Sequence, residues 1–255
     1  MSGPVQSIER AAAVLRLLAG GPGRLGLGEV ASALGLAKGT AHGILRTLQH
    51  VDFVEQDQAT GKYQLGAALL HLGSSYLDVN ELRSRSINWA DALAARSGEA
   101  VRLGTPLEGR VLIVHHVFRP DDTLQTLDVG SLLPLHASSL GKVLLAFGAT
   151  PLEPVVAAGL ETYTRHTAGT AEELGRALAE IREAGWAADI QEMIMGEAGV
   201  AAPIRGHGGL VVGAMGVTGA LERICDSKGR PHPPLVDMVR GAARAVSRDL
   251  GAARW

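Results

Sequence analysis

The sequence predicts an α+β protein with a small helical part at the N-terminus and a larger part built of strands and helices. Over the first fifty residues, apolar side chains recur at the three- and four-residue steps of helices. From residue 99 onward, apolar segments of strand length alternate with helical ones. A chain of 255 residues is long enough for one or two domains, so the change of period indicates two parts.

Composition narrows the class further. Hydrophobic residues make up 46% and charged residues 20%, which suits an ordinary packed core, and a net charge of −2 gives no overall attraction to nucleic acid or anionic membranes. Cys225 is the single cysteine, which excludes a disulfide framework and a cysteine-rich zinc site. Glu9 and Arg10 interrupt the first apolar pattern and argue against a signal peptide. We expect a cytoplasmic protein with no metal, no cofactor and no membrane segment.

The first fifty residues predict three helices. The first runs from Gln6 to Ala19, and the loop GGPGRLG at 20–26 ends it because Gly and Pro favour loops. A short second helix begins at Leu27 and ends at Gly35, since glycine readily adopts the left-handed conformation there. A third helix follows, with Ala41, Ile44, Leu45 and Leu48 facing inward. A short helix, a glycine turn and a longer helix are typical of a helix-turn-helix.

Residues 53–66, FVEQDQATGKYQLG, predict a two-stranded ribbon that turns at Thr60-Gly61 and carries Lys62 near its tip. A ribbon directly after a helix-turn-helix is a wing. The third helix has polar side chains opposite its apolar face, as major-groove entry requires, and small residues at its start that allow a close approach to DNA. A solvated face of an ordinary three-helix bundle is the alternative reading.

Three blocks later in the chain extend this pattern: LPLHASSLGKVLLAF at 133–147, GWAADIQEMIMGEAGVAAPI at 185–204 and GLVVGAMGVTGALERI at 209–224. Together with QSIERAAAVLRLLA and LGEVASALGLAKGTAHGILRTL, they resemble the IclR-type transcriptional regulators. The resemblance implies a winged helix-turn-helix DNA-binding domain over 1–66, a linker helix over 67–80 that contributes to dimerisation, and a GAF-like effector-binding domain over 81–255. Relatives form dimers and tetramers.

The resemblance implies DNA contacts from the first domain, and the expected DNA-binding residues are Arg10, Lys38, Gly39, Thr40, His42, Arg46 and Lys62. Family members often carry Ser-Thr at the start of the third helix and an Arg a little further on. Gly39-Thr40 and Gly43 stand in those places here. Thr40, His42 and Arg46 would therefore carry more of the recognition.

Beyond residue 80 the sequence predicts a helix over 81–98, with Leu82, Trp89 or Ile87, Ala90 and Leu93 inward, and a hairpin over 99–120 that turns at Leu107–Gly109. Further strands are expected at Leu124–Val129, Ala187–Glu192, Gly199–Arg205 and Gly209–Thr218, and further helices at Ser138–Phe147, Ala171–Ala184 and Pro234–Leu250. Strands flanked by helices predict an antiparallel sheet with helices packed on it.

The resemblance also places an effector pocket in this part. Asp189 and Thr218 match an acidic and a hydroxyl residue of the family's pocket, and Ser138, Ser139 and Leu140 belong to the segment that lines it. Gly199 and Gly216 stand where relatives carry Cys or Ser, so we expect a larger pocket with fewer hydrogen bonds. Ser138 and Ser139 as a helix cap, Asp189 as a surface residue and Thr218 as a strand residue are the structural alternatives.

Two stretches, LGLAKGTAHGILRTLQ and VLIVHHVFRPDD, most resemble the branch of the family that regulates glycerol catabolism in actinomycetes. This resemblance implies glycerol 3-phosphate or a similar small acid as the effector. A phosphate needs cationic or amide donors, and Arg102 and the helix start at Ser138–Leu140 are candidates.

Other signals are weak. LGKVLL lacks the first glycine of a phosphate loop, because His136 stands there, and His115 and His116 would point to opposite faces of a strand. We therefore expect a repressor, not an enzyme, that binds double-stranded operator DNA as a dimer or tetramer and is released by a small metabolite. The alternatives are a metabolic enzyme with an accessory DNA-binding domain and a protein-interaction module.

Overall fold

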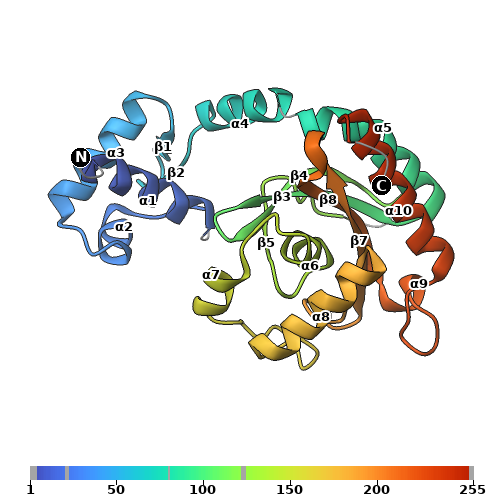
Figure 1. Ribbon diagram of the computed structural model, residues 1–255. Coiled ribbons are helices and arrows are strands. Elements are labelled where there is room, and N and C mark those ends of the chain that lie inside the picture. The colour runs from blue at the N-terminus through green and yellow to red at the C-terminus, as the bar shows by residue number, and fades with distance from the viewer. Residues whose placement is uncertain (1–4, 21–22, 80, 122–124, 253–255) are drawn as a thin grey trace. The chain divides into compact units, whose positions relative to one another are not determined.

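The computed structural model describes residues 5–20, 23–79, 81–121 and 125–252, and the chain divides into two compact units, 1–79 and 80–255. Three helices of the first unit pack together around Val14, Leu18, Val30, Leu45 and Leu48. They are α1 (Gln6–Gly20), α2 (Leu27–Ala33) and α3 (Lys38–His50). Their order and bounds confirm the predicted helix-turn-helix (Figure 1).

A small antiparallel ribbon follows α3. Strand β1 (Val54–Gln56) pairs with β2 (Tyr63–Leu65), and Val54 and Tyr63 turn inward onto the helical core. Tyr63 also forms a bridge with Leu25, which attaches the ribbon to the segment before α2. Helix α4 (Ala68–Val79) completes this unit, and the last residue of the predicted linker, Asn80, lies outside the described residues.

The second unit is built on one antiparallel sheet in the order β5-β4-β3-β8-β7-β6. Its strands are β3 (Ala100–Leu107), β4 (Arg110–Val117), β5 (Leu132–Pro134), β6 (Ala187–Ile190), β7 (Glu197–Arg205) and β8 (Val211–Ala220). The hairpin β3–β4 turns at Glu108–Gly109, as the sequence predicts, and both residues take positive φ. The predicted antiparallel sheet with flanking helices is confirmed.

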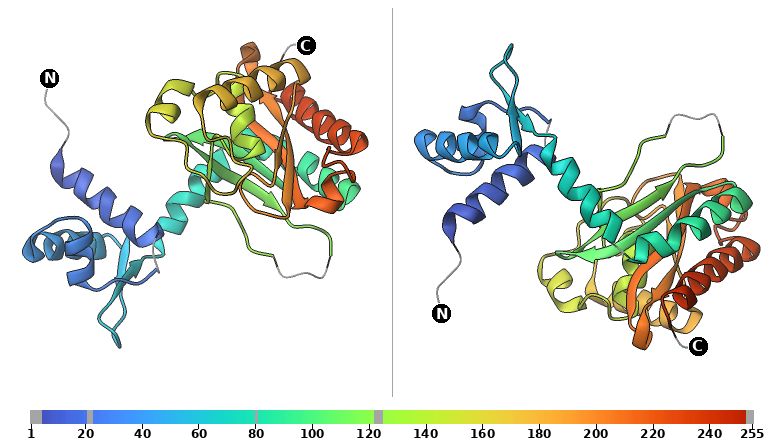
Figure 2. Two further views of the ribbon diagram at one scale, coloured as in Figure 1. Left: turned by 90° about the horizontal axis from the view of Figure 1, so that it is seen from below. Right: turned by 90° about the horizontal axis from the view of Figure 1, so that it is seen from above.

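Helices cover both faces of the sheet. Helices α5 (Glu81–Ser97) and α10 (Pro233–Asp249) lie side by side on one face, and α6 (Ser139–Ala146) and α8 (Ala171–Ala184) lie on the other (Figures 1 and 2). Short helices α7 (Leu152–Ala157) and α9 (Leu221–Ile224) and the 3₁₀ turn His207–Gly209 complete the unit. The core under α6 includes Ile113, Leu144, Leu174 and Ala201.

One expectation for this unit is wrong. Residues 125–129 form no strand, and the third strand lies at Leu132–Pro134 instead, where Leu112 and Arg110 pair with it. In α5 the sequence left Ile87 or Trp89 as the inward residue, and the structure favours Ile87, which is half-buried. Trp89 is 37% exposed and donates to Asp249 Oδ2 at 2.8 Å, while Ser86 is fully buried. Ser86 fits inside because its hydroxyl donates to the Leu82 carbonyl at 2.6 Å, which leaves no unpaired polar group.

Candidate functional site

Helix α3 exposes the face opposite its core. Ala41, Leu45 and Leu48 are buried against α1 and α2, and at about 100° per residue the opposite face is centred between Gly39 and Gly43. All the predicted DNA-binding residues of this helix are exposed: Lys38, Gly39, Thr40, His42 and Arg46. The structure therefore brings five of the seven predicted residues together on one helix.

The start of α3 has no side-chain cap. Ala37 occupies the N-cap position, so the amides of the first turn have no partner from that side chain. Such amides favour a phosphate oxygen, and Lys38 and Thr40 flank them. The first turn therefore offers donors to a DNA backbone as well as side chains to base edges.

The other two predicted residues lie apart from α3. Lys62 lies on the wing and is partly exposed, with its Nζ 3.7 Å from Glu29 Oε2 in a surface ion pair of little energetic weight. The wing turn is ordered by Asp57, whose Oδ1 accepts the amides of Ala59 and Thr60, each at 2.9 Å. Arg10 lies on α1 and is half-buried.

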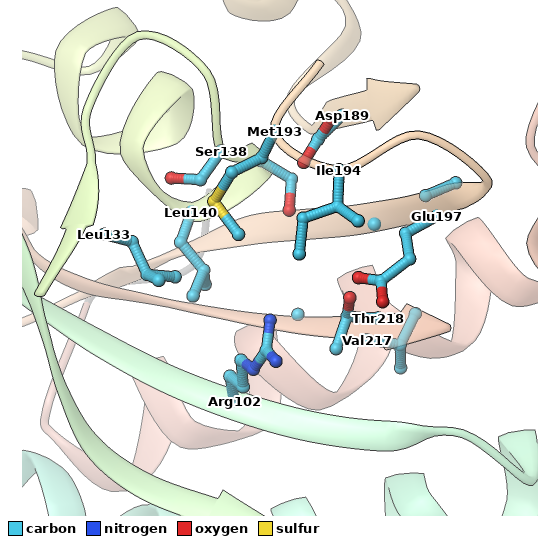
Figure 3. Close-up of a pocket in the computed structure, with 14 residues that line it drawn as sticks. Arg102, Leu133, Ser138, Leu140, Asp189, Met193, Ile194, Glu197, Val217 and Thr218 are labelled. Atoms are coloured by element: carbon cyan, nitrogen blue, oxygen red, sulfur yellow. The ribbon is translucent and has the colours of Figure 1, made fainter. Parts of the chain in front are cut away.

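The predicted effector residues all line one cavity in the second unit (Figure 3). They are Arg102, Ser138, Ser139, Leu140, Asp189, Gly199, Gly216 and Thr218. Six further residues line the cavity and were not predicted: Leu133, Met193, Ile194, Glu197, Ala198 and Val217. Of these, Met193, Ile194 and Glu197 lie within the family-like block at 185–204, whose position near Asp189 was the available signal.

Strand register explains how distant residues meet. Asp189 on β6 pairs with Gly199 on β7, and Gly199 pairs with Thr218 on β8. Gly216, two residues before Thr218, pairs with Arg102 on β3. Directly paired residues point to the same face of a sheet, so the floor of the cavity is a single sheet face that runs from Asp189 to Arg102.

The start of α6 forms the wall above this floor. Ser138 is its N-cap: the hydroxyl accepts the Gly141 amide at 3.1 Å and donates to the Pro134 carbonyl at 2.6 Å. The structural alternative therefore holds for Ser138, whose hydroxyl is already engaged. Ser139 is the free hydroxyl at this helix start, because it makes no hydrogen bond within the described residues.

Asp189 is held in an unusual state for a carboxyl group. Burial raises its pKa from 3.8 to about 6, opposed by the Glu192 amide, which donates to Oδ1 at 2.8 Å. The negative charge of Glu192 raises the pKa further, and Lys142 lowers it. A carboxyl with a pKa near 6 can accept from a ligand hydroxyl when ionised and donate when protonated.

A buried ion pair fixes the loop that bounds the cavity. Lys142, on α6, is 4% exposed, and its Nζ contacts Glu192 Oε1 in the loop between β6 and β7. The hydroxyl of Thr167 donates to the Glu192 carbonyl at 2.6 Å from the other side. The next residues, Met193 and Ile194, line the cavity from this loop (Figure 3).

Arg102 is not a free cation. Its Nε and Nη2 both lie 2.7 Å from Asp128 Oδ2, and the backbone amide of Asp128 donates to His116 Nδ1 at 3.2 Å. His116 is paired with Arg102 across β3 and β4, and burial lowers its pKa. His115 faces the other side, where the charge of Arg83 acts on it, as expected for neighbours on a strand.

The two pocket glycines differ in what surrounds them. A Cβ on Gly199 would lie 3.0 Å from Ser139 Oγ, at the cavity. A Cβ on Gly216 would lie 2.5 Å from the Val200 carbonyl oxygen and 2.8 Å from Ala201 Cβ. The expectation that glycine enlarges the pocket therefore suits Gly199, whereas at Gly216 neighbouring β7 already fills the space.

The cavity is small. Its volume is about 20 Å³, which is room for about one water molecule. A ligand of several heavy atoms therefore needs the surrounding side chains to move. Within the described ranges, no group of three potential metal ligands is found, and no helix is long and apolar enough to cross a membrane.

Comparison with known proteins identifies the class. The C-terminal domain of the bacterial transcriptional regulator IclR matches residues 74–248, and the IclR helix-turn-helix domain matches residues 7–58. The chain belongs to the IclR family of transcriptional regulators. It is therefore a helix-turn-helix DNA-binding protein of a family that binds small effectors and oligomerises, and its relatives are regulators, not enzymes.

Individual relatives agree with this assignment. The chain is 54% identical to the glycerol operon regulatory protein of Streptomyces coelicolor over 100% of both chains. The IclR regulator structure from Alicyclobacillus acidocaldarius is 28% identical, with a TM-score of 0.83, over 96% of this chain and 99% of that one. An IclR homologue from Microbacterium hydrocarbonoxydans in complex with 4-hydroxybenzoate is 26% identical, with a TM-score of 0.80, over 97% and 100%.

Proposed function

We propose that this regulator represses a glycerol or other small-carbon catabolic operon and that a small metabolite such as glycerol 3-phosphate releases it from the operator. The observation that carries the proposal is 54% identity, over the full length of both chains, to the glycerol operon regulatory protein of Streptomyces coelicolor. The chemistry of the cavity supports the same class of ligand.

The cavity has two chemically different ends. Arg102 on β3 supplies a guanidinium that a phosphate would share with, or take over from, Asp128, and the amides of Ser139 and Leu140 at the start of α6 are further donors for a phosphate. Asp189 and Glu197, with the hydroxyl of Thr218, supply oxygen atoms that accept from or donate to alcohol groups. A small polyol phosphate fits such a division, with its phosphate toward Arg102 and its hydroxyls toward the acids.

A ligand can enter only when the cavity widens, and this widening is the conformational change to which we attribute the response to the ligand. A ligand shifts a conformational equilibrium only by its differential affinity for the two states. A cavity of about 20 Å³ is too small for a polyol phosphate, so the ligand would favour a state in which the cavity is wider. Arg102 lies between Val101 and Leu103, which are buried on the sheet face that α5 covers, so a shift of β3 acts on α5.

On the DNA side, α3 enters the major groove and Lys62 of the wing contacts the backbone. Two copies of α3 in a symmetric dimer would contact half-sites about 34 Å apart, one helical turn. Lys38, Arg46 and Lys62 contact phosphates or guanines, so binding weakens steeply with salt.

The test is fluorescence anisotropy of the full chain with duplexes from upstream of its own gene and of neighbouring genes, at two salt concentrations. The proposal expects selective binding that weakens as salt rises. Equal affinity for all duplexes would overturn the assignment of a local operator.

Isothermal titration calorimetry with glycerol 3-phosphate tests the pocket. Arg102→Ala is expected to weaken binding at least tenfold, and Arg176→Ala, on the exposed side of α8, is the matched control that leaves it unchanged. Unchanged affinity of Arg102→Ala would remove this residue from the site. Binding of glycerol alone, with no binding of the phosphate, would replace the phosphate ester by the free polyol.

A further inference from the structure

The exposed face of α3 carries two glycines where a DNA-binding helix is expected to carry side chains. Gly39 and Gly43 are one turn apart, and both lie on the face diametrically opposite the buried Ala41, Leu45 and Leu48. Arg46 and His50 continue that face toward the C-terminal end of the helix. In the first turns of α3 this face therefore carries no side chain, and Thr40, His42 and Thr47 lie at its borders.

Nothing inside the protein accounts for these glycines. A Cβ built on either residue meets no heavy atom within 4 Å. Both lie within a regular helix, and neither has a positive φ. Glycine is among the least favourable residues in a helix interior, so Gly43 weakens α3 without relieving any close contact of the folded chain, and Gly39, in the first turn, does so to a smaller extent.

We propose that Gly39 and Gly43 let the backbone of α3 come into van der Waals contact with base edges on the floor of the major groove. This inference rests on the proposed DNA-binding function of α3. Two observations support it besides the open space beside the glycines. The match to the IclR helix-turn-helix domain indicates that α3 is the helix that contacts DNA. Glycine also lowers the stability of a helix, and no contact within the folded chain explains that loss. A methyl group at either position would hold the helix away from the bases.

The contact also affects neighbouring side chains. Thr47 donates its hydroxyl to the Gly43 carbonyl at 2.9 Å, so this hydroxyl lies against the bare backbone. Arg46 follows Gly43 by three residues, on the same face. With the helix axis close to the bases, Arg46 reaches a guanine edge without full extension.

Alanine substitution separates this inference from a purely structural effect. Gly43→Ala is expected to raise the unfolding temperature of the first unit by about 4–8 °C, and Gly39→Ala, in the first turn of α3, to raise it by less. Each variant is expected to weaken operator binding at least tenfold. Affinity for an unselected duplex of the same length is expected to stay within about twofold. The probe is a duplex that the wild-type protein selects from random-sequence DNA, measured by fluorescence anisotropy.

Gly175→Ala is the matched control. Gly175 lies within α8, has no heavy atom within 4 Å of a built Cβ and belongs to the second unit. This variant is expected to gain stability and keep wild-type operator affinity. A comparable loss of affinity in Gly175→Ala would overturn the inference, because the effect would then not come from contact with DNA.

The remaining outcomes are also decisive. Selective binding by the wild type with unchanged affinity in Gly39→Ala and Gly43→Ala overturns this inference alone. Loss of stability in both variants overturns its premise, because the glycines would then serve the fold. If the wild type selects no sequence from the random pool, the proposed DNA-binding function and this inference both fail.

Discussion

Glycine has opposite roles in the two units. In α3 the space beside Gly39 and Gly43 is open, whereas beside Gly216 it is taken by the Val200 carbonyl and Ala201 of β7. The same contrast holds for polar side chains. Those of α3 are exposed, while Lys142 and Glu192 at the pocket are largely buried and paired with each other. A surface that binds an external partner keeps its groups free, and a pocket that responds to a ligand holds them in a prepared arrangement.

The largest expected effect is at the buried ion pair. Lys142→Met leaves the largely buried carboxylate of Glu192 without its partner, so we expect the second unit to lose about 3–5 kcal/mol of stability. The measurement is urea unfolding followed by a signal from this unit. Adding Glu192→Gln to Lys142→Met should recover much of the loss, because the unpaired charge is gone. A loss below about 1 kcal/mol in the single variant would show that Glu192 is well solvated.

Asp189 should make stability depend on pH. Its pKa in the folded chain is about 6, above the ordinary 3.8, so its contribution is fully present below pH 3.8 and is lost as pH rises through 6. The shift corresponds to at most about 3 kcal/mol. Asp189→Asn, which does not titrate, should therefore gain stability relative to the wild type between pH 4 and pH 7. A difference in unfolding free energy that stays constant over this range would contradict the raised pKa.

A methyl group added at the pocket glycines should lower stability, whereas in α3 it should raise it. Gly216→Ala places a methyl group against backbone atoms and should destabilise the second unit by about 1–3 kcal/mol. Gly199→Ala meets the Ser139 hydroxyl at 3.0 Å, which can rotate away, and the Val217 carbonyl oxygen at 3.2 Å, a less severe backbone contact than at Gly216, so its effect should be smaller. Thermal unfolding of both variants gives the order. Equal losses would mean that the sheet adjusts at Gly216 as easily as Ser139 does.

The smallest expected effect on stability is at Arg46. Arg46→Ala removes an exposed side chain and should change the free energy of unfolding by no more than about 0.5 kcal/mol. Operator binding should nevertheless weaken by about 1–3 kcal/mol, because a base contact is lost. Anisotropy titrations with operator and unfolding curves of the same preparation report both quantities. A large stability loss would show that Arg46 serves the fold.

The first unit could be predicted closely from the sequence because its signals are local. The period of Ala41, Leu45 and Leu48 and the glycine at 35 fix α3 to within a residue of its observed start. The exposed residues of α3 then follow from the same helical period. The open space beside Gly43 could be found only from the structure, because the sequence does not show whether another part of the chain fills it.

The pocket could be predicted only in part. Its strands were found from alternation, and the family resemblance pointed to Asp189 and Thr218, but Arg102 meets them through pairing across β8 and β7. Such register is non-local, so Glu197 and the pairing of Arg102 with Asp128 were missed. Residues 124–129 were expected to form a strand. Over 125–129, however, the chain pairs with no strand of the sheet, and apolar alternation alone cannot show whether a partner strand is present. Helical period alone could not decide between Ile87 and Trp89 as the inward residue of α5, and the hydrogen bond from the Trp89 indole N–H to Asp249 holds Trp89 at the surface.

Ligand binding in the pocket and operator binding by α3 are expected to be coupled. The most direct test is the operator dissociation constant of the wild-type chain measured across a titration of glycerol 3-phosphate, with pocket occupancy followed in parallel by calorimetry. Coupling of about 1–3 kcal/mol predicts that operator affinity falls about 5–150-fold as the pocket fills. Unchanged operator affinity with a saturated pocket would show that ligand binding and operator binding are not coupled.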